Sequence, residues 1–129
     1  MSRTLPAPKP DPETEKFWAA AAEGRLLLHR CKKCGRVHYY PRIVCPACGA
    51  MEPEALQSSG EGEIYSVSVM RRGEDAPYAV AYVTLNEGPS ILTNILADDL
   101  GALKAGDRVR LAWAETDGGP PVPMFTPAG

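Results

Sequence analysis

The clearest pattern in the chain is an alternation of apolar and polar residues that begins near residue 64. In the segment 64–70, Tyr65, Val67 and Val69 alternate with serines, which predicts a β-strand with one buried face. Further runs of this kind are separated by turn-forming residues and lie at 78–85, 90–96, 108–114 and 122–126. Five short strands joined by turns predict a small barrel or sandwich.

A short helix is predicted at 98–103, between the third and fourth of these strands. An OB-fold carries a helix at this point, so we expect a five-stranded OB-fold barrel over residues 60–127. Proline in the last strand confines that strand to an edge. Trp113 shares a face with Val109 and is expected in the core. Asn94, among apolar neighbours, either satisfies buried backbone groups or lines a ligand face.

The N-terminal part has a different pattern. Residues 1–11 are rich in proline and poor in large apolar groups, so they predict a flexible arm. The Asp-Pro pair at 11–12 is typical of a helix start and Gly24 of a helix end, which predicts a helix at 12–23. We interpret Trp18 in this helix as a packing anchor, with a partner-facing role as the alternative. A strand is expected to follow at 25–30.

Four cysteines lie between the helix and the barrel, spaced Cys31-x-x-Cys34 and Cys45-x-x-Cys48, and each pair is followed by glycine. Such a segment bends into a knuckle that points both sulfurs at one ion, because glycine accepts a positive φ. Two knuckles supply four thiolates, which complete a tetrahedral shell for one zinc ion per chain. A complete shell has no open position for substrate, so the metal is expected to be structural. We therefore predict a helix and zinc ribbon over residues 12–52.

Other uses of these cysteines are weaker. Disulfides are disfavoured because nothing marks the chain as secreted, and a redox pair usually accompanies a βαβ pattern, which is absent. Iron, as in rubredoxin, suits the same four sulfurs. His29 and His38 flank the knuckles and are interpreted as surface or neighbouring groups rather than ligands. Tyr39 and Tyr40 either cover a small core or form an exposed contact surface. Residues 50–61 predict a linker.

Charge is distributed unevenly along the chain. The whole sequence has 14 Lys and Arg against 16 Asp and Glu, a net charge of −2. No acid occurs between residues 25 and 48, and the cations there are Arg25, Arg30, Lys32, Lys33, Arg36 and Arg42. These cations either stabilise the thiolates or form a site for phosphate or an acidic partner.

Several function classes are not indicated by the sequence. No apolar run approaches the roughly 20 residues that span a bilayer, and the N-terminus lacks a secretory pattern, so we expect a cytoplasmic protein without membrane contact. We find no Ser-His-Asp set and no motif of paired catalytic carboxylates. The chain is therefore not expected to be an enzyme by itself.

Taken together, these motifs resemble a known family, the OB-fold proteins with an N-terminal rubredoxin-like zinc ribbon, long catalogued as a domain of unknown function. The matching features are the four-cysteine knuckles together with Phe17-Trp18, Glu23-Gly24-Arg25-Leu26, Pro41-Arg42, Gly62-Glu63-Ile64-Tyr65 and Glu87-Gly88-Pro89. The resemblance implies a mainly β protein with an N-terminal helix, a rubredoxin-like zinc ribbon and an OB-fold barrel. It also implies a non-catalytic subunit that binds acyl-CoA enzymes, including thiolase-like enzymes, thiolase-type aldolases and hot-dog-fold enoyl-CoA hydratases, some in steroid side-chain or lipid metabolism.

Two functions follow as hypotheses. In the first, the chain docks on an acyl-CoA enzyme and helps form its CoA or acyl channel. The residues proposed to contact CoA or the partner are Arg25, Lys32, Lys33, Arg36, Arg42, Trp18, Tyr39 and Tyr40. In the second, the chain is a nucleic-acid-binding module, which would require a basic groove with stacking aromatics. The barrel segment is acidic and aromatic residues make up only 7% of the chain, so the first hypothesis is favoured.

Overall fold

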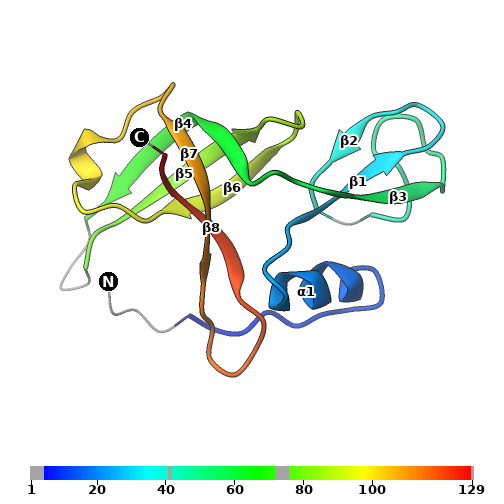
Figure 1. Cartoon of the computed structure of the whole chain (residues 1–129), viewed down its shortest axis with the longest axis horizontal. Helices are drawn as coiled ribbons and strands as arrows, with labels where there is room; N and C mark the ends of the chain where they lie inside the picture. Colours follow the sequence, from blue (N-terminus) through cyan, green and yellow to red (C-terminus); the bar gives the residue numbers. More distant parts are fainter. Residues whose placement is uncertain (1–4, 41, 72–75, 129) are drawn as a thin grey trace.

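The computed structural model describes residues 5–40, 42–71 and 76–128. The chain is mainly β, with one α-helix, a three-stranded sheet and a closed five-stranded barrel. Figure 1 shows the barrel and the small sheet side by side, with the helix below the segment that joins them. Neither helix within the described ranges has the length and hydrophobicity of a membrane-spanning segment. The predicted fold class is confirmed.

The helix α1 spans Glu15–Ala22, so it begins later than the predicted residue 12. The Oδ1 atom of Asp11 accepts hydrogen bonds from the N–H groups of Glu13 (3.0 Å) and Thr14 (2.9 Å). Asp11 therefore closes a turn ahead of the helix instead of capping the helix itself. The predicted end is confirmed, because Gly24 has a φ of 77° and its N–H donates to the carbonyl of Ala21.

Strand β1 (Leu27–Cys31) lies at the centre of the small sheet, between β2 (Val37–His38) and β3 (Pro53–Gln57). Both neighbours run antiparallel to β1. The prediction that residues 50–61 form a linker is wrong for 53–57, which pair with β1 along its whole length. This segment is short and lacks alternation, so only its pairing partner reveals it as a strand.

The barrel contains β4 (Glu61–Met70), β5 (Tyr78–Leu85), β6 (Ser90–Ile95), β7 (Arg108–Ala114) and β8 (Val122–Pro127) in the order β4-β5-β6-β8-β7. The predicted short helix is the 3-10 turn η1 at Leu100–Ala102, between β6 and β7. Thus the order of elements matches the OB-fold expectation. The predicted edge position of the last strand is wrong, because β8 pairs with β7 and also bridges to β6 through Ile95 and Phe125.

One β-bulge in β4 changes which residues point inward. The register with β5 shifts between Ile64 and Ser66. Alternation continues up to the bulge, with Ile64 buried at 1% exposure and Tyr65 72% exposed; after the bulge Ser66 is exposed as well, and Val67 and Val69 are half-buried. The sequence pattern had grouped Tyr65 with Val67 and Val69 on one face, which the bulge makes wrong for Tyr65.

Two other sequence predictions can be judged in the barrel. Trp113 is half-buried and packs against the core, so it lies at the margin of the core. The side-chain nitrogen of Asn94 donates to the carbonyl of Ala79 at 2.9 Å, which confirms the expectation that Asn94 satisfies a backbone group. The arm was predicted at 1–11. Residues 1–4 lie outside the described residues, and residues 5–11 form no helix or strand.

Glu87, in the turn between β5 and β6, holds the segment that joins the small sheet to the barrel. Its two carboxylate oxygens accept hydrogen bonds from the hydroxyl of Ser58 at 2.8 Å and the N–H of Ser59 at 2.9 Å. The Ser58 hydroxyl oxygen in turn accepts from the N–H of Gly60 at 3.0 Å. Partial burial raises the pKa of Glu87, but these hydrogen bonds outweigh it and leave the pKa below its ordinary value of 4.5.

We predict that Glu87→Ala lowers the free energy of unfolding at pH 7 by about 1 kcal/mol, because two hydrogen bonds to a partly exposed carboxylate are lost. Since folding lowers the pKa of Glu87, its stabilisation is present above pH 4.5 and disappears as the pH falls below that value. The difference in the free energy of unfolding between wild type and variant, measured by urea unfolding, should become smaller as the pH is lowered from 7 into the acid range. Glu115→Ala, at an exposed position in the barrel, is the matched control. An equal loss for both variants would contradict the role of Glu87.

Candidate metal centre

The two knuckles have the same backbone geometry. Cys31 ends β1, and the N–H of Gly35 donates to its carbonyl at 2.8 Å; in the second knuckle the N–H of Gly49 donates to the carbonyl of Cys45 at 3.0 Å. Gly35 and Gly49 have φ values of 78° and 79°, which confirms the expected positive φ. A side chain at either position would strain this turn, so glycine is required for the knuckle to close.

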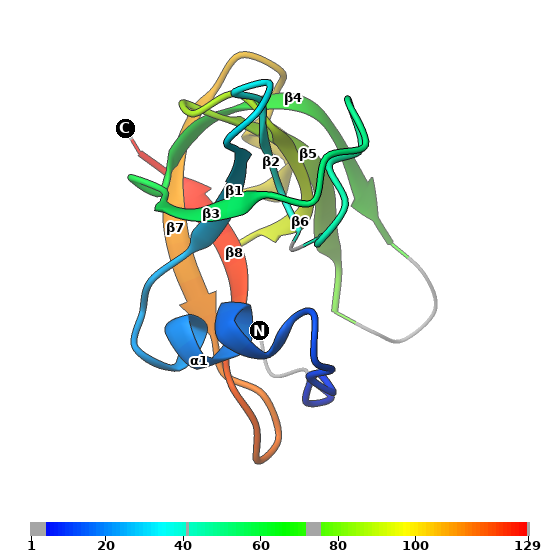
Figure 2. The same cartoon turned by 90° about the vertical axis from the view of Figure 1, so that its right-hand side faces the viewer.

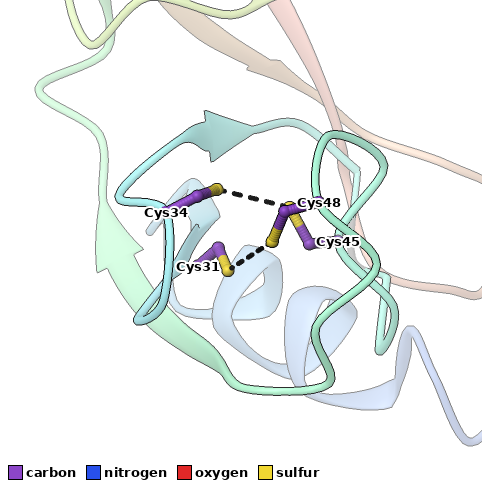
Figure 3. Close-up of side chains that lie close together, drawn as sticks. All are labelled: Cys31, Cys34, Cys45 and Cys48. Atoms are coloured by element: carbon purple, nitrogen blue, oxygen red, sulfur yellow. Dashed lines mark hydrogen bonds between the residues drawn. The ribbon is translucent and has the colours of Figure 1, made fainter.

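The knuckles bring all four cysteine sulfurs together, as Figure 3 shows. The Sγ atoms lie within 4.8 Å of one another, with Cys31 and Cys48 at 3.6 Å and Cys34 and Cys45 at 3.7 Å. An ion bonded to four sulfurs at about 2.3 Å in a tetrahedron places them about 3.8 Å apart. The four residues therefore fit one tetrahedral metal ion, as their spacing in the sequence predicted.

Backbone N–H groups favour the thiolate form of the first cysteine in each knuckle, Cys31 and Cys45. The N–H of Cys34 lowers the pKa of Cys31 against the opposing effect of burial, and the N–H groups of Cys48 and Ala47 lower the pKa of Cys45. At Cys48 the N–H of Ala50 lowers the pKa, but burial and the neighbouring thiols together have the larger, opposite effect. The pKa of Cys48 therefore lies above its ordinary value. Four thiolates repel one another, so full ionisation of this cluster requires a cation at its centre.

The two histidines lie beside the metal centre and outside its ligand group. His29 and His38 face each other across β1 and β2, with ring centroids 5.7 Å apart. The ligand group found among the described residues consists of the four cysteines. Burial lowers the pKa of His29, which favours a neutral ring. This arrangement agrees with the interpretation of both histidines as neighbouring groups.

An aromatic cluster supports the ribbon on α1. The indole N–H of Trp18 donates to the hydroxyl of Tyr40 at 3.2 Å, and Phe17 packs edge-on against Tyr39 and Tyr40 with centroids 5.7 and 5.3 Å away. Trp18 is only 8% exposed, and burial raises the pKa of Tyr39 above its ordinary value. Little of Trp18 is available to a partner, so its packing interpretation fits the structure, and the tyrosines cover a core.

The six ribbon cations fall into two groups. Arg25 binds Glu23 at 2.6 Å and Arg30 binds Glu54 at 3.1 Å, so these two charges are paired within the chain. The other four are exposed, and no ion pair is found for them among the described residues; they are Lys32, Lys33, Arg36 and Arg42. The Arg30–Glu54 pair was not foreseen because it depends on β3. We call the four exposed cations the cationic surface.

A four-thiol ribbon joined to a closed five-stranded barrel defines a class of protein, the combined metal-ribbon and OB-fold proteins. Family models match both parts: "ChsH2, rubredoxin-like zinc ribbon domain" over residues 18–54 and "ChsH2, C-terminal OB-fold domain" over residues 56–114. The chain therefore belongs to the ChsH2 family of DUF35 proteins.

Several curated relatives are subunits or scaffolds of enzymes. A "DUF35 domain-containing scaffold protein" of Methanothermobacter thermautotrophicus is 37% identical over 78% of this chain and 81% of its own length. "Benzoylsuccinyl-CoA thiolase subunit BbsA" of Thauera aromatica is 31% identical over 86% of this chain and 85% of its own. A "Probable enoyl-CoA hydratase alpha subunit" of Thermomonospora curvata is 33% identical over 87% of this chain, which spans only 37% of that longer protein.

A solved structure resembles nearly the whole chain. One chain of the "Ltp2-ChsH2(DUF35) aldolase" superposes with a TM-score of 0.82 at 30% identity and covers 95% of this chain and 99% of its own. The match includes both the ribbon and the barrel. The architecture expected from the family resemblance is therefore confirmed.

Proposed function

We propose that this chain is a non-catalytic accessory subunit that docks on an acyl-CoA enzyme of thiolase, thiolase-type aldolase or hydratase type. The observation that carries the proposal is its membership of a family whose relatives are named as a thiolase subunit, a hydratase subunit, an aldolase component and scaffolds. Four thiolates fill the coordination shell of the candidate ion, which suits a structural role. Catalysis would then belong to the partner.

The ion is proposed to be zinc, one per chain, held by Cys31, Cys34, Cys45 and Cys48. Bound zinc would contribute folding energy to the ribbon, because the ligands come together only when the two knuckles form. The separations between the sulfur atoms suit one four-coordinate ion, and the family model that matches residues 18–54 describes a zinc ribbon; both support this assignment.

The cationic surface is proposed to contact either the phosphates of CoA or an acidic surface of the partner. Its arginines can form two parallel hydrogen bonds to one phosphate, and its lysines add positive charge. Arg25 and Arg30 contribute less to this surface because each is paired with a glutamate. The contribution of the aromatic cluster would be indirect: it would hold the ribbon in place through Trp18, Tyr39 and Tyr40.

The barrel is proposed to line part of the acyl or pantetheine channel. A hollow of about 1370 Å³ opens at the barrel end next to η1, and Tyr78, Ile95, Leu100 and Leu103 are among the residues that line it. The segment from Tyr78 to Asn94 starts at this hollow. If this segment covers the channel of the partner enzyme, it would exclude water from the channel and orient the thioester. Both effects would raise kcat/KM.

We predict that the purified protein contains about one zinc ion per chain by elemental analysis. Cys34→Ser should lose the metal and the fold of the ribbon, measured by zinc content and near-ultraviolet circular dichroism, because three thiolates leave the shell incomplete. Met51→Ser, at an exposed position in the same ribbon, should keep both. Stoichiometric iron with a visible thiolate absorption band would contradict zinc, and a folded Cys34→Ser protein that retains its metal would contradict the structural role.

We predict that Lys32→Glu combined with Lys33→Glu weakens binding to the partner or raises the KM for the acyl-CoA by about tenfold at low salt. The effect should decrease as salt is added, since exposed charges are screened. Lys9→Glu with Lys16→Glu makes the same change in charge at exposed positions outside the cationic surface, where no ion pair is found among the described residues, and serves as the control. Unchanged binding and KM across the salt series would mean that these lysines are only solvated.

We predict that a tagged chain captures an acyl-CoA enzyme from its native lysate and that co-expression gives a stable hetero-complex. The contact should bury more than about 1,000 Å². The chain alone should be inactive, and the enzyme should lose most of its activity without it. The proposal fails if the identified enzyme runs at full rate alone and no complex survives gel filtration. Binding of plain oligonucleotide at moderate salt would instead favour a nucleic-acid module.

A further inference from the structure

Three exposed apolar side chains form a row across the outer face of the barrel. Tyr65, Tyr82 and Leu92 are 72%, 47% and 58% exposed and come from the adjacent strands β4, β5 and β6. Tyr82 pairs in register with Leu92 on one side and with Ser66 on the other, and the bulge leaves Tyr65 and Ser66 both on the outer face. We call these three residues the barrel row. Contiguous exposed apolar residues, unlike single ones, indicate a contact surface.

Toward β5 and β6 the surroundings of the barrel row are uncharged. Its cross-strand neighbours include Ser68, Val80 and Asn94, and the hydroxyls of Thr84 and Ser90 lie 3.0 Å apart on the same face. Among the described residues, the charged neighbours lie on the β7 side, where Glu61 and Glu63 stand opposite Arg110 and Arg108, and after the far end of β4 at Arg71. The two glutamates and the two β7 arginines offset one another, so a matching surface must be apolar over the barrel row itself and can be polar at the β7 margin.

Two other occupants fit less well. A single-stranded nucleic acid needs unopposed cations beside the stacking aromatics, and the β7 arginines nearest to the barrel row, Arg108 and Arg110, stand opposite Glu63 and Glu61. A second copy that met the barrel row face to face, row against row, would bury too little, because the barrel row exposes about 350 Å² and a stable interface needs about 800 Å² per partner. A larger partner can extend from the barrel row toward the ribbon, where Ile43, Val44 and Met51 are 49%, 49% and 67% exposed. Figure 2 shows the loop between β2 and β3 on the side where β4 and β5 lie, away from β7.

We propose that the barrel row is the docking surface for an apolar patch on the acyl-CoA enzyme subunit. This inference rests on the proposed function and adds which face of the barrel meets the enzyme. Tyrosine suits this position because its ring buries apolar area while its hydroxyl keeps a hydrogen bond at the margin. The barrel row would then supply the desolvated centre of the interface, and the cationic surface a separate contact that depends on salt.

The test uses the full chain and the enzyme that the tagged wild-type chain captures, once identified as an acyl-CoA enzyme and purified. Tyr82→Lys combined with Leu92→Lys should raise the Kd about 100-fold, because two ammonium groups are placed in an apolar contact. Asp117→Lys changes the net charge equally in the turn between β7 and β8, and Tyr82→Phe keeps the ring; both should bind within about twofold of wild type. Zinc content and Tm establish that each variant is folded. If the double variant does not fold, Tyr82→Ser alone replaces it, with a smaller loss of affinity expected.

The outcomes separate the docking face from the function. A folded double variant that binds the enzyme with wild-type Kd overturns the docking face while the accessory function stands. A wild-type chain that binds no acyl-CoA enzyme overturns the proposed function. Sedimentation equilibrium tests for a homodimer. If the wild type forms a homodimer and the double variant loses it but still binds the enzyme, the barrel row belongs to a contact with a second copy and the proposal is overturned. Binding of a dT oligonucleotide that the double variant abolishes would overturn it as well.

Discussion

The convergence of four cysteine sulfurs is the constraint on which the N-terminal part of this protein depends. The ribbon has little else to hold it: β2 contains two residues, and in the second knuckle only Cys45 is buried among the described residues 42–49. So few buried side chains cannot offset the entropy of ordering two loops. Bonds from the four sulfurs to a bound ion would supply the stability that so small a core lacks, and the paired backbone hydrogen bonds of the knuckles set the directions in which the sulfurs point.

The ribbon is nevertheless joined firmly to the barrel. Phe17, Trp18 and Leu28 belong to the same hydrophobic cluster as Ile64 and Phe125, so the helix, the small sheet and the barrel share one core. The Glu87 carboxylate adds a polar connection at the linker through Ser58 and Ser59. A shared core fixes the ribbon relative to the barrel, which an accessory subunit needs if it presents two surfaces to one partner.

Those two surfaces differ in their chemistry. The cationic surface lies on the ribbon around a site whose four thiolates and zinc would carry a charge of about −2, so its lysines and arginines would both balance that charge and remain available to anions. The barrel row is neutral and apolar. A partner that meets both would gain buried area from the barrel and charge complementarity from the ribbon, with different dependence on salt.

The sequence by itself determined the elements whose cause is local. The Cys-x-x-Cys-Gly spacing defines each knuckle, Gly24 ends the helix, and the alternation of apolar residues marks the barrel strands, because each depends on residues that are close together in the chain. The family resemblance added the OB-fold with its ribbon. Tertiary structure alone decided the features that depend on distant partners. Residues 53–57 become β3 only because β1 offers them a pairing edge, and Val67 and Val69 turn to the opposite face from Tyr65 because a bulge shifts the register with β5. The pairing of Arg30 with Glu54, which removes one cation from the ribbon surface, follows from the same strand contact and has no local signal in the sequence.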